Sequence, residues 1–180
     1  VSSGAPFAGA FRTPVELNNV NPQRLIIQGG NSTYESLNQG DTIAEVGAGV
    51  FNGSITQNAI EYGGNKGGVP NLDVLWVGSG SDVYFRSTAG PLAPTSSDPT
   101  TGTIRDLAID SDDWATAFII DSNQVFTTTN EGASWTDITG NLLTMANDLR
   151  SIRFVAGPNI DAIVVGTNQG VFVASTMDPG

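Results

Sequence analysis

The sequence of 180 residues contains no cysteine and no histidine, and it has only 7 basic residues against 18 acidic ones. The absence of cysteine excludes disulfides and thiolate chemistry. The absence of histidine removes the usual general base, the Ser-His-Asp arrangement and most zinc sites. With a net charge of −11 there is no cluster of Lys and Arg that could hold phosphate groups. Nucleic acid and anionic membrane surfaces are therefore poor partners.

Long apolar runs are also missing. No stretch approaches the 18 or so apolar residues of a transmembrane helix, so no membrane insertion is expected. Sustained helical periodicity is absent as well, and the nearest candidate, residues 141–151, is short. What the chain does contain is 22 Gly and 9 Pro between short apolar runs. This pattern is typical of an all-β protein with many turns.

Three kinds of strand-like segment recur four times along the chain. The first kind alternates apolar and other residues, and its leading apolar residues are separated by 45, 47 and 45 positions: Val15, Ile60, Leu107 and Ile152. The second is a run rich in β-branched residues at 24–30, 73–80, 116–123 and 161–168. The third carries an aromatic anchor: Tyr34, Phe85, Phe126 and Phe172. A weaker fourth segment follows the first three sets at 42–47, 91–97 and 135–140.

A period of 40–50 residues with four strands per unit is typical of a β-propeller blade. The sequence therefore predicts an all-β fold, a β-propeller of about four four-stranded blades, as one domain or as a segment of a larger propeller. The expected units are residues 13–57, 58–103, 104–148 and 149–180, the last of them incomplete. A β-sandwich with irregular hairpins is the alternative.

Two turns in register with this repeat share the pattern Ser/Thr-x-Asn-x-Gly-x-x followed by an apolar residue. Their positions, 92 residues apart, are Ser36, Asn38, Gly40 and Ile43 in one copy and Thr128, Asn130, Gly132 and Trp135 in the other. Hydroxyl and amide side chains hold a compact turn by bonding to nearby backbone, and Gly permits positive φ. The final Ile or Trp is expected to fold back as an apolar plug between blades.

These turns resemble the Asp-box, usually written S/T-x-D-x-G-x-x-W, and the chain is similar to the Asp-box or BNR-repeat propeller superfamily over residues 11 to 176. The stretches "FRTPVELNNVNPQRLIIQGGNSTYES" and "NQVFTTTNEGASWTDITGNL" resemble blades of very large secreted proteins of cyanobacteria and other environmental bacteria. The resemblance implies that the boxes lie on the blade periphery, away from the axial face where ligands bind. Asn replaces Asp in both boxes, and the second and fourth units have none.

The densest acidic cluster, Asp110, Asp112 and Asp113, falls in a turn between two strands of the third unit. A solvated turn is one interpretation. Calcium binding is another, because hard cations prefer carboxylate and carbonyl oxygens, although the spacing lacks the Gly and distal Glu of an EF-hand loop. Trp114, which follows this turn, is the better candidate for stacking on carbohydrate, whereas Trp76 is expected in the core. No other cofactor is expected.

The units allow three architectures: part of a larger propeller, a four-bladed propeller in which residues 4–11 supply the missing strand, or several copies paired through exposed edge strands. The favoured function is a non-catalytic extracellular module for adhesion or assembly in a bacterial surface or matrix protein, with a protein partner or further copies of the chain. The first residues lack a signal peptide's basic start, so secretion would require a signal that was removed or lies upstream. The alternative is part of a glycoside hydrolase or a carbohydrate-binding propeller.

Overall fold

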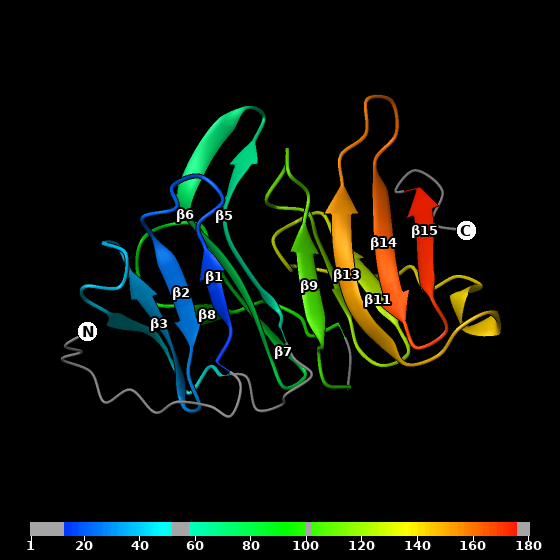
Figure 1. The fold of residues 1–180 in the computed structure, drawn as a ribbon, viewed down its shortest axis with the longest axis horizontal. Coiled ribbons are helices and arrows are strands. Elements are labelled where there is room, and N and C mark those ends of the chain that lie inside the picture. The colour runs from blue at the N-terminus through cyan, green and yellow to red at the C-terminus, as the bar shows by residue number, and fades with distance from the viewer. Residues whose placement is uncertain (1–12, 52–57, 100–101, 176–180) are drawn as a thin grey trace.

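A computed structural model describes residues 13–51, 58–99 and 102–175 of the chain. In this part of the chain there are fifteen β-strands and one short 3-10 helix, η1 (Leu142–Thr144). The strands form four antiparallel sheets, each built from one continuous stretch of sequence and ordered as they follow in the chain (Figure 1). The helix occupies part of residues 141–151, the one segment with weak helical character.

The first two sheets have four strands each. Sheet I contains β1 (Val15–Leu17), β2 (Leu25–Gln28), β3 (Ser32–Ser36) and β4 (Ala44–Ala48). Sheet II contains β5 (Ile60–Lys66), β6 (Val69–Ser79), β7 (Asp82–Arg86) and β8 (Ala93–Pro94). The outer strands, β4 and β8, come from the weaker fourth segments of the sequence.

The other two sheets differ in strand number. Sheet III contains β9 (Asp106–Ile109), β10 (Ala117–Ile120), β11 (Val125–Thr128) and β12 (Thr136–Asp137). Sheet IV contains β13 (Leu149–Val155), β14 (Ala162–Thr167) and β15 (Val171–Ser175). Within the residues that the structure describes, no strand pairs with the outer side of β15.

The four sheets stand side by side in an open arc, with sheet I at one end and sheet IV at the other (Figure 1). The first strands of neighbouring sheets pack together, β1 with β5, β5 with β9 and β9 with β13. The three strand-like segments predicted in each of the four units are therefore confirmed. They form the inner, middle and third strands of each sheet. Residues 4–11, expected as a closing strand, lie outside the described residues.

An apolar core fills each seam between neighbouring sheets. Seam I/II contains Ile26 and Leu75, seam II/III contains Trp76 and Ile119, and seam III/IV contains Ile120 and Ile152. The sheets are buried on both faces where they have two neighbours, which explains why middle strands such as β10 read as unbroken apolar runs rather than as alternating patterns. No helix among the described residues has the length and apolar character needed to cross a bilayer.

Candidate functional site

The turns that begin at Ser36 and at Thr128 have the same hydrogen-bonding geometry. In the first, Ser36 Oγ accepts the Gly40 N–H at 2.8 Å, and Asn38 Oδ1 accepts the Thr42 N–H at 3.0 Å. In the second, Thr128 Oγ1 accepts the Gly132 N–H at 3.0 Å, and Asn130 Oδ1 accepts the Ser134 N–H at 3.0 Å. In both turns the amide oxygen of Asn accepts a backbone N–H four residues further along the chain, as a carboxylate oxygen of Asp could also do.

The glycines of the two turns provide a matched test of this geometry. Both have positive φ, +91° at Gly40 and +78° at Gly132, but a Cβ at Gly40 would meet nothing within 4 Å, whereas one at Gly132 would lie 2.4 Å from Thr95 Cγ2. Gly40→Ala should therefore cost about 1 kcal/mol of unfolding free energy through backbone strain alone. Gly132→Ala should cost about 1–3 kcal/mol more, because the turn must move off sheet II. Urea unfolding of both variants measures the difference, and equal losses would contradict this account.

Trp135, the last residue of the second box, lies between two sheets. Its ring packs against the seam II/III core, with an edge-on contact to Trp76 at 6.3 Å between ring centroids, and its Nε1–H donates to the Ser97 carbonyl at 3.1 Å. Leu92 has the same position in sheet II, immediately before β8, and packs into seam I/II while its N–H donates to the Val46 carbonyl at 2.7 Å. Ile43, immediately before β4, is half-buried.

The acidic turn is packed against the tip of the β5–β6 hairpin. Asp110 Oδ1 accepts the Asp112 N–H at 2.8 Å, and Lys66 Nζ lies 3.2 Å from Asp113 Oδ1. Burial raises the pKa of Asp110, against the effect of that backbone N–H. No group of three or more carboxylates suited to a metal ion is present in the described part of the chain, and calcium binding by this turn stays a prediction.

Trp114 is half-buried rather than fully exposed. Its ring stacks on Phe85 at 6.0 Å, and Lys66 Nζ lies 5.0 Å from the ring centroid. Its carbonyl accepts the Nε1–H of Trp76 at 3.0 Å. Trp76 is fully buried, which confirms the expectation that it belongs to the core. The protein itself therefore contacts much of the Trp114 surface that a sugar ring would stack on, and carbohydrate contact there stays a prediction.

The inner strands gather charged residues along the inside of the arc. Glu16 of β1, Glu61 of β5 and Arg153 of β13 occupy the middle position of the alternating inner-strand pattern. Asp106 of β9 lies with them, and its Oδ2 accepts the Ile152 N–H at 2.9 Å and the Arg153 Nη1–H at 3.0 Å. Asp106, the acid with which Arg153 pairs, is buried.

Glu61 borders a groove of about 380 Å³ that is also lined by Asn19, Asn65, Arg153 and Phe154. Burial raises the pKa of Glu61 to about 7, and the neighbouring Glu16 carboxylate adds to the effect. Asn19 Nδ2 donates to Glu61 Oε2 at 3.3 Å. This groove is the polar candidate site of the molecule. Sequence reasoning missed it, although the charged middle residues of the inner-strand pattern were a usable signal.

The raised pKa of Glu61 predicts a pH-dependent stability. The folded state holds the proton more tightly than the unfolded chain, whose pKa is near 4.5, so this contribution is fully present below pH 4.5 and is lost as the pH rises through about 7. Between acidic and neutral pH, the free energy of unfolding of the wild-type protein should fall by up to about 3 kcal/mol more than that of Glu61→Gln. Urea unfolding across that range measures it. Both proteins keep Glu16, Asp106 and Arg153. If their unfolding free energies changed with pH in the same way, the raised pKa of Glu61 would be contradicted.

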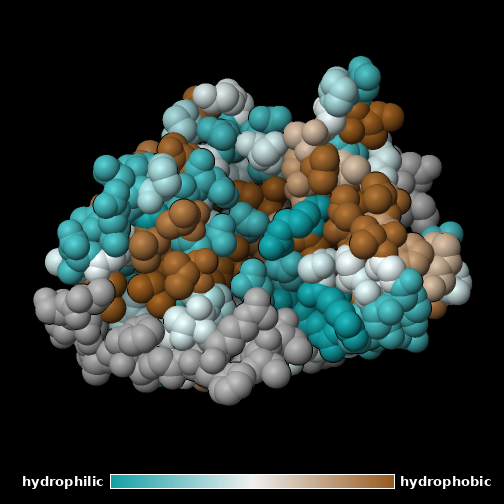
Figure 2. Space-filling model, in the orientation of Figure 1, coloured by the Kyte–Doolittle hydropathy of each residue, from teal (hydrophilic) through white to brown (hydrophobic). Residues whose placement is uncertain are grey.

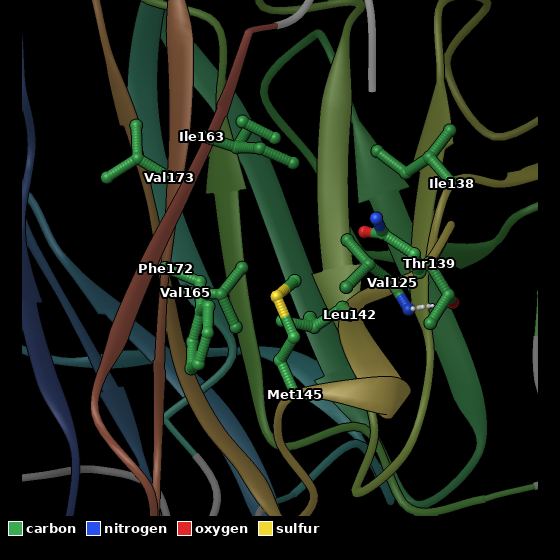
Figure 3. A pocket seen from close by; sticks show the side chains of 11 residues that line it. Val125, Ile138, Thr139, Leu142, Met145, Ile163, Val165, Phe172 and Val173 are labelled. Atoms are coloured by element: carbon green, nitrogen blue, oxygen red, sulfur yellow. Dashed lines mark hydrogen bonds between the residues drawn. The ribbon is translucent and has the colours of Figure 1, made fainter. Parts of the chain in front are cut away.

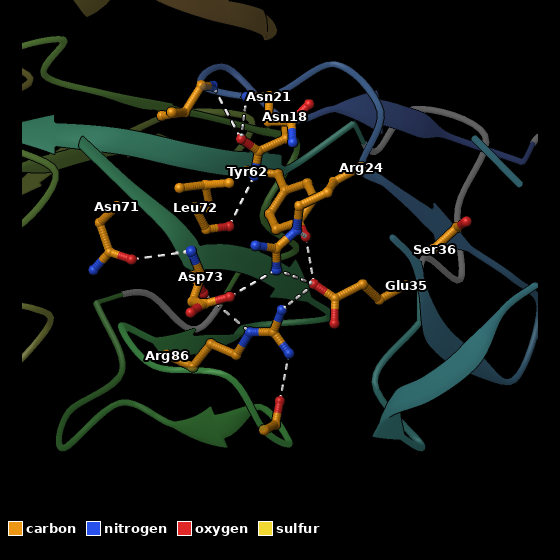
Figure 4. Close-up of polar contacts among 12 residues, drawn as sticks. Asn18, Asn21, Arg24, Glu35, Ser36, Tyr62, Asn71, Leu72, Asp73 and Arg86 are labelled. Atoms are coloured by element: carbon orange, nitrogen blue, oxygen red, sulfur yellow. Dashed lines mark hydrogen bonds and ion pairs between the residues drawn. The ribbon is translucent and has the colours of Figure 1, made fainter. Parts of the chain in front are cut away.

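A second polar cluster ties sheet I to sheet II (Figure 4). Glu35 Oε1 accepts hydrogen bonds from Tyr62 Oη, from Arg24 Nη2 at 3.1 Å and from Arg86 Nη2 at 2.5 Å. Arg24 also reaches Asp73 Oδ1 at 2.7 Å. Burial by itself would raise the pKa of Glu35, but the Tyr62 hydroxyl and the two guanidinium groups hold that pKa below its usual range. Every charge is paired, so the cluster acts as a structural clamp.

An apolar groove lies in seam III/IV, and β15 contributes Phe172 and Val173 to its lining (Figure 3). Its walls come from sheet III, η1 and sheet IV, and its lining includes Val125, Ile138, Met145, Ile163 and Phe172. The groove encloses about 90 Å³, and a more polar hollow of about 340 Å³, also lined by Ile138 and Ile163, adjoins it. This groove is the apolar candidate site.

Both ends of the arc carry exposed apolar side chains, and Figure 2 shows hydrophobic residues over β1 and β2 and over β14 and β15. Val15 and Leu17 of β1 are 56% and 52% exposed. Val171 and Val173 of β15 are 69% and 67% exposed, and Val173 also contributes to the lining of the apolar groove. These faces have the composition of the buried seams but no neighbour among the described residues.

Comparisons with known proteins show the fold. Neither a family model nor a curated protein matches the chain. Among solved structures, an ancestral GH74 enzyme is similar with a TM-score of 0.62 and 12% identity, over 94% of this chain and 26% of that protein. YCF48 from Cyanidioschyzon merolae is similar with a TM-score of 0.56 and 17% identity, over 92% of this chain and 51% of that protein.

The extracellular domain of a one-component system from B. thetaiotaomicron is also similar, with a TM-score of 0.57 and 13% identity over 90% of this chain and 21% of that protein. These are β-propeller proteins, so the chain has a propeller-type fold in the form of an open arc. It spans only about a fifth to a half of the length of these three structures.

Proposed function

We propose that this chain is a non-catalytic propeller module that binds a protein partner at the edge of sheet IV, within a secreted bacterial surface or matrix protein of the Asp-box type. The observation that carries the proposal is the apolar groove beside β15, whose outer side pairs with no strand among the described residues. An added strand gains affinity from main-chain hydrogen bonds, and a neighbouring pocket for one of its side chains adds specificity. The groove provides that pocket.

Several observations support this role. An unpaired, apolar edge strand is an aggregation hazard, so a partner that covers β15 has a clear physical benefit. The net charge of −11 and the lack of cysteine suit an acidic extracellular module that needs no disulfides. Among the similar proteins, one is an extracellular domain and YCF48 has been solved bound to a D1 peptide, in a structure with a TM-score of 0.51 and 12% identity over 94% of this chain and 57% of that protein.

The test is a selection of displayed random 12-residue peptides on the wild-type chain. Selected peptides should alternate apolar and polar residues and should bind at least about tenfold more weakly to Val173→Glu or Met145→Glu, because a carboxylate would then be buried under the added strand. The matched control is Val69→Glu, since Val69 is 66% exposed on the distant β5–β6 hairpin. Peptides that bind all three variants equally would show that the site lies elsewhere.

Carbohydrate binding or hydrolysis is the second candidate, and the Glu61 groove favours it, because a half-buried carboxyl group with a pKa near 7 suits a general acid. A glycan array and a reducing-sugar assay test it. Under the assembly proposal the chain releases no sugar. Hydrolysis that disappears in Glu61→Gln would instead establish the enzyme.

A further inference from the structure

The charges on the inner side of the arc do not balance among the described residues. All the basic side chains that the structure describes already have acidic partners: Arg24, Lys66, Arg86, Arg105, Arg150 and Arg153. Arg153, which borders the Glu61 groove, is paired with Asp106 at 3.0 Å. In the described part of the chain, Glu16 and Glu61 therefore have no counter-ion of their own.

Both of these carboxyl groups are half-buried. Burial raises the pKa of Glu16 as well as that of Glu61, and the charge of Glu16 raises the pKa of Glu61 further. A carboxylate withdrawn from water without a positive partner is destabilised, and a like charge beside it adds to the cost. A positive charge brought to Glu61 from outside the chain would remove both effects.

The amide side chains of the groove suit a ligand that donates hydrogen bonds. Asn19 uses its Nδ2–H groups within the protein, on Glu61 Oε2 at 3.3 Å and on the Gly63 carbonyl at 3.5 Å. Asn65 likewise donates from Nδ2 to the Ser111 carbonyl at 3.5 Å. This leaves Glu61 Oε1 and the Oδ1 atoms of both amides as acceptors. An ammonium group has three N–H donors and no acceptor, so it matches this set.

The rest of the lining suits a hydrocarbon stem. The groove lies between β5 and β13, beside the end of β9 (Figure 1), and Ile109 and Phe154 border it together with Glu61. Its volume of about 380 Å³ is larger than an ammonium group alone requires. Lysine side chains commonly lay their stems along apolar surface while the charged head reaches a polar group. A bare metal ion would use none of this apolar lining.

We propose that the Glu61 groove binds an alkylammonium ion, either a free amine or the side chain of a lysine in another protein. The ammonium group lies against Glu61 and Glu16, and its hydrocarbon stem lies along Ile109 and Phe154. The site shares no lining residue with the apolar groove in seam III/IV, so it does not depend on the partner proposed for β15.

Titration of the full-length protein with two matched pentapeptides, followed by amide chemical shifts in NMR spectra, tests the site. Both peptides are blocked at their ends, and the central residue is lysine in one and the uncharged Nε-acetyl-lysine in the other. The lysine peptide should shift amides of β5 and β13, and the acetylated peptide should bind at least about tenfold more weakly. Butylamine, which is the lysine side chain without a peptide, distinguishes the sources: tighter binding of the peptide assigns a protein ligand, and tighter binding of butylamine assigns a free amine.

Glu61→Gln and Glu16→Gln should each weaken binding of the lysine peptide, Glu61→Gln by at least about tenfold, because each removes one negative charge. The matched control is Glu45→Gln, which makes the same change at an exposed residue of β4 and should bind like the wild type.

Binding should also depend on pH, because only the ionised carboxylate attracts the ammonium group. Since the pKa of Glu61 is about 7, the affinity of the wild type should fall about tenfold from about pH 8 to about pH 6, and that of Glu61→Gln should change less. The charged groups that face Glu61, which are Glu16, Asp106 and Arg153, are the same in both proteins.

No shift in the wild type, equal binding of the two peptides, or equal binding by the wild type and Glu61→Gln would overturn the inference. Displacement of the amine from Glu61 by an equal concentration of calcium chloride would overturn it too, in favour of a metal site. Glycans that bind the groove while the lysine peptide does not would assign it to carbohydrate instead. Met145→Glu and Val173→Glu should bind the lysine peptide like the wild type, so failure of this site and failure of the site at β15 are distinguishable.

Discussion

Replacing Glu35 with Ala should lower the free energy of unfolding by about 3–5 kcal/mol, because it leaves buried positive charge without its partner. The Arg86 side chain is only 4% exposed, and its Nη2 donates to Glu35 Oε1 at 2.5 Å. Arg24, with a side chain 12% exposed, would keep Asp73 as its only paired carboxylate. Because this cluster joins sheet I to sheet II, sheet I should separate first.

Urea unfolding followed by circular dichroism measures this loss, with Glu45→Ala, an exposed glutamate on the same sheet, as the matched control. Glu35→Gln keeps the acceptor oxygen, so it should lose less unfolding free energy than Glu35→Ala. The pKa of Glu35 is lowered by folding, so the stability that it contributes is present above its ordinary pKa of 4.5 and disappears as the pH falls through the folded value. The difference in unfolding free energy between wild type and Glu35→Ala should therefore become smaller in acid. A difference that does not change with pH would mean that charge pairing does not cause the loss of stability.

Trp76→Ala should cost about 3–5 kcal/mol, the usual range for a large aromatic side chain removed from a core. Trp76 is fully buried in seam II/III, where the centroid of its ring lies 4.2 Å from the ring centroid of Phe85. Its Nε1–H donates to the Trp114 carbonyl. The substitution removes packing between two sheets and leaves that carbonyl unpaired.

Trp76→Phe separates these two effects. It retains most of the apolar contact and should cost about 1–3 kcal/mol, largely through the unsatisfied carbonyl. Denaturant unfolding read by circular dichroism is the measurement, since the tryptophan fluorescence itself changes. The control is Leu37→Ala, a substitution in the turn between β3 and β4 at a side chain that is 60% exposed, which should stay within about 0.5 kcal/mol. A cost for Trp76→Ala as small as that of the control would contradict the packing of seam II/III.

The sequence alone determined the strand repeat. Alternation around Val15, Ile60 and Ile152, together with the β-branched middle runs, reflects local physics, because a strand that is buried on one or both faces must place apolar side chains with a fixed period. The turn pattern at Thr128 and Asn130 was equally readable, since its hydrogen bonds join residues at most four positions apart.

Only the tertiary structure decided which surfaces remain open. The groove in seam III/IV and the Glu61 carboxyl with its raised pKa depend on contacts between residues far apart in the chain. Seam burial and charge pairing are properties of how the sheets stack, and no local pattern encodes the relative position of two sheets. The repeat therefore predicted the blades, whereas the arrangement of the blades in an open arc determined which apolar side chains at its two ends are exposed.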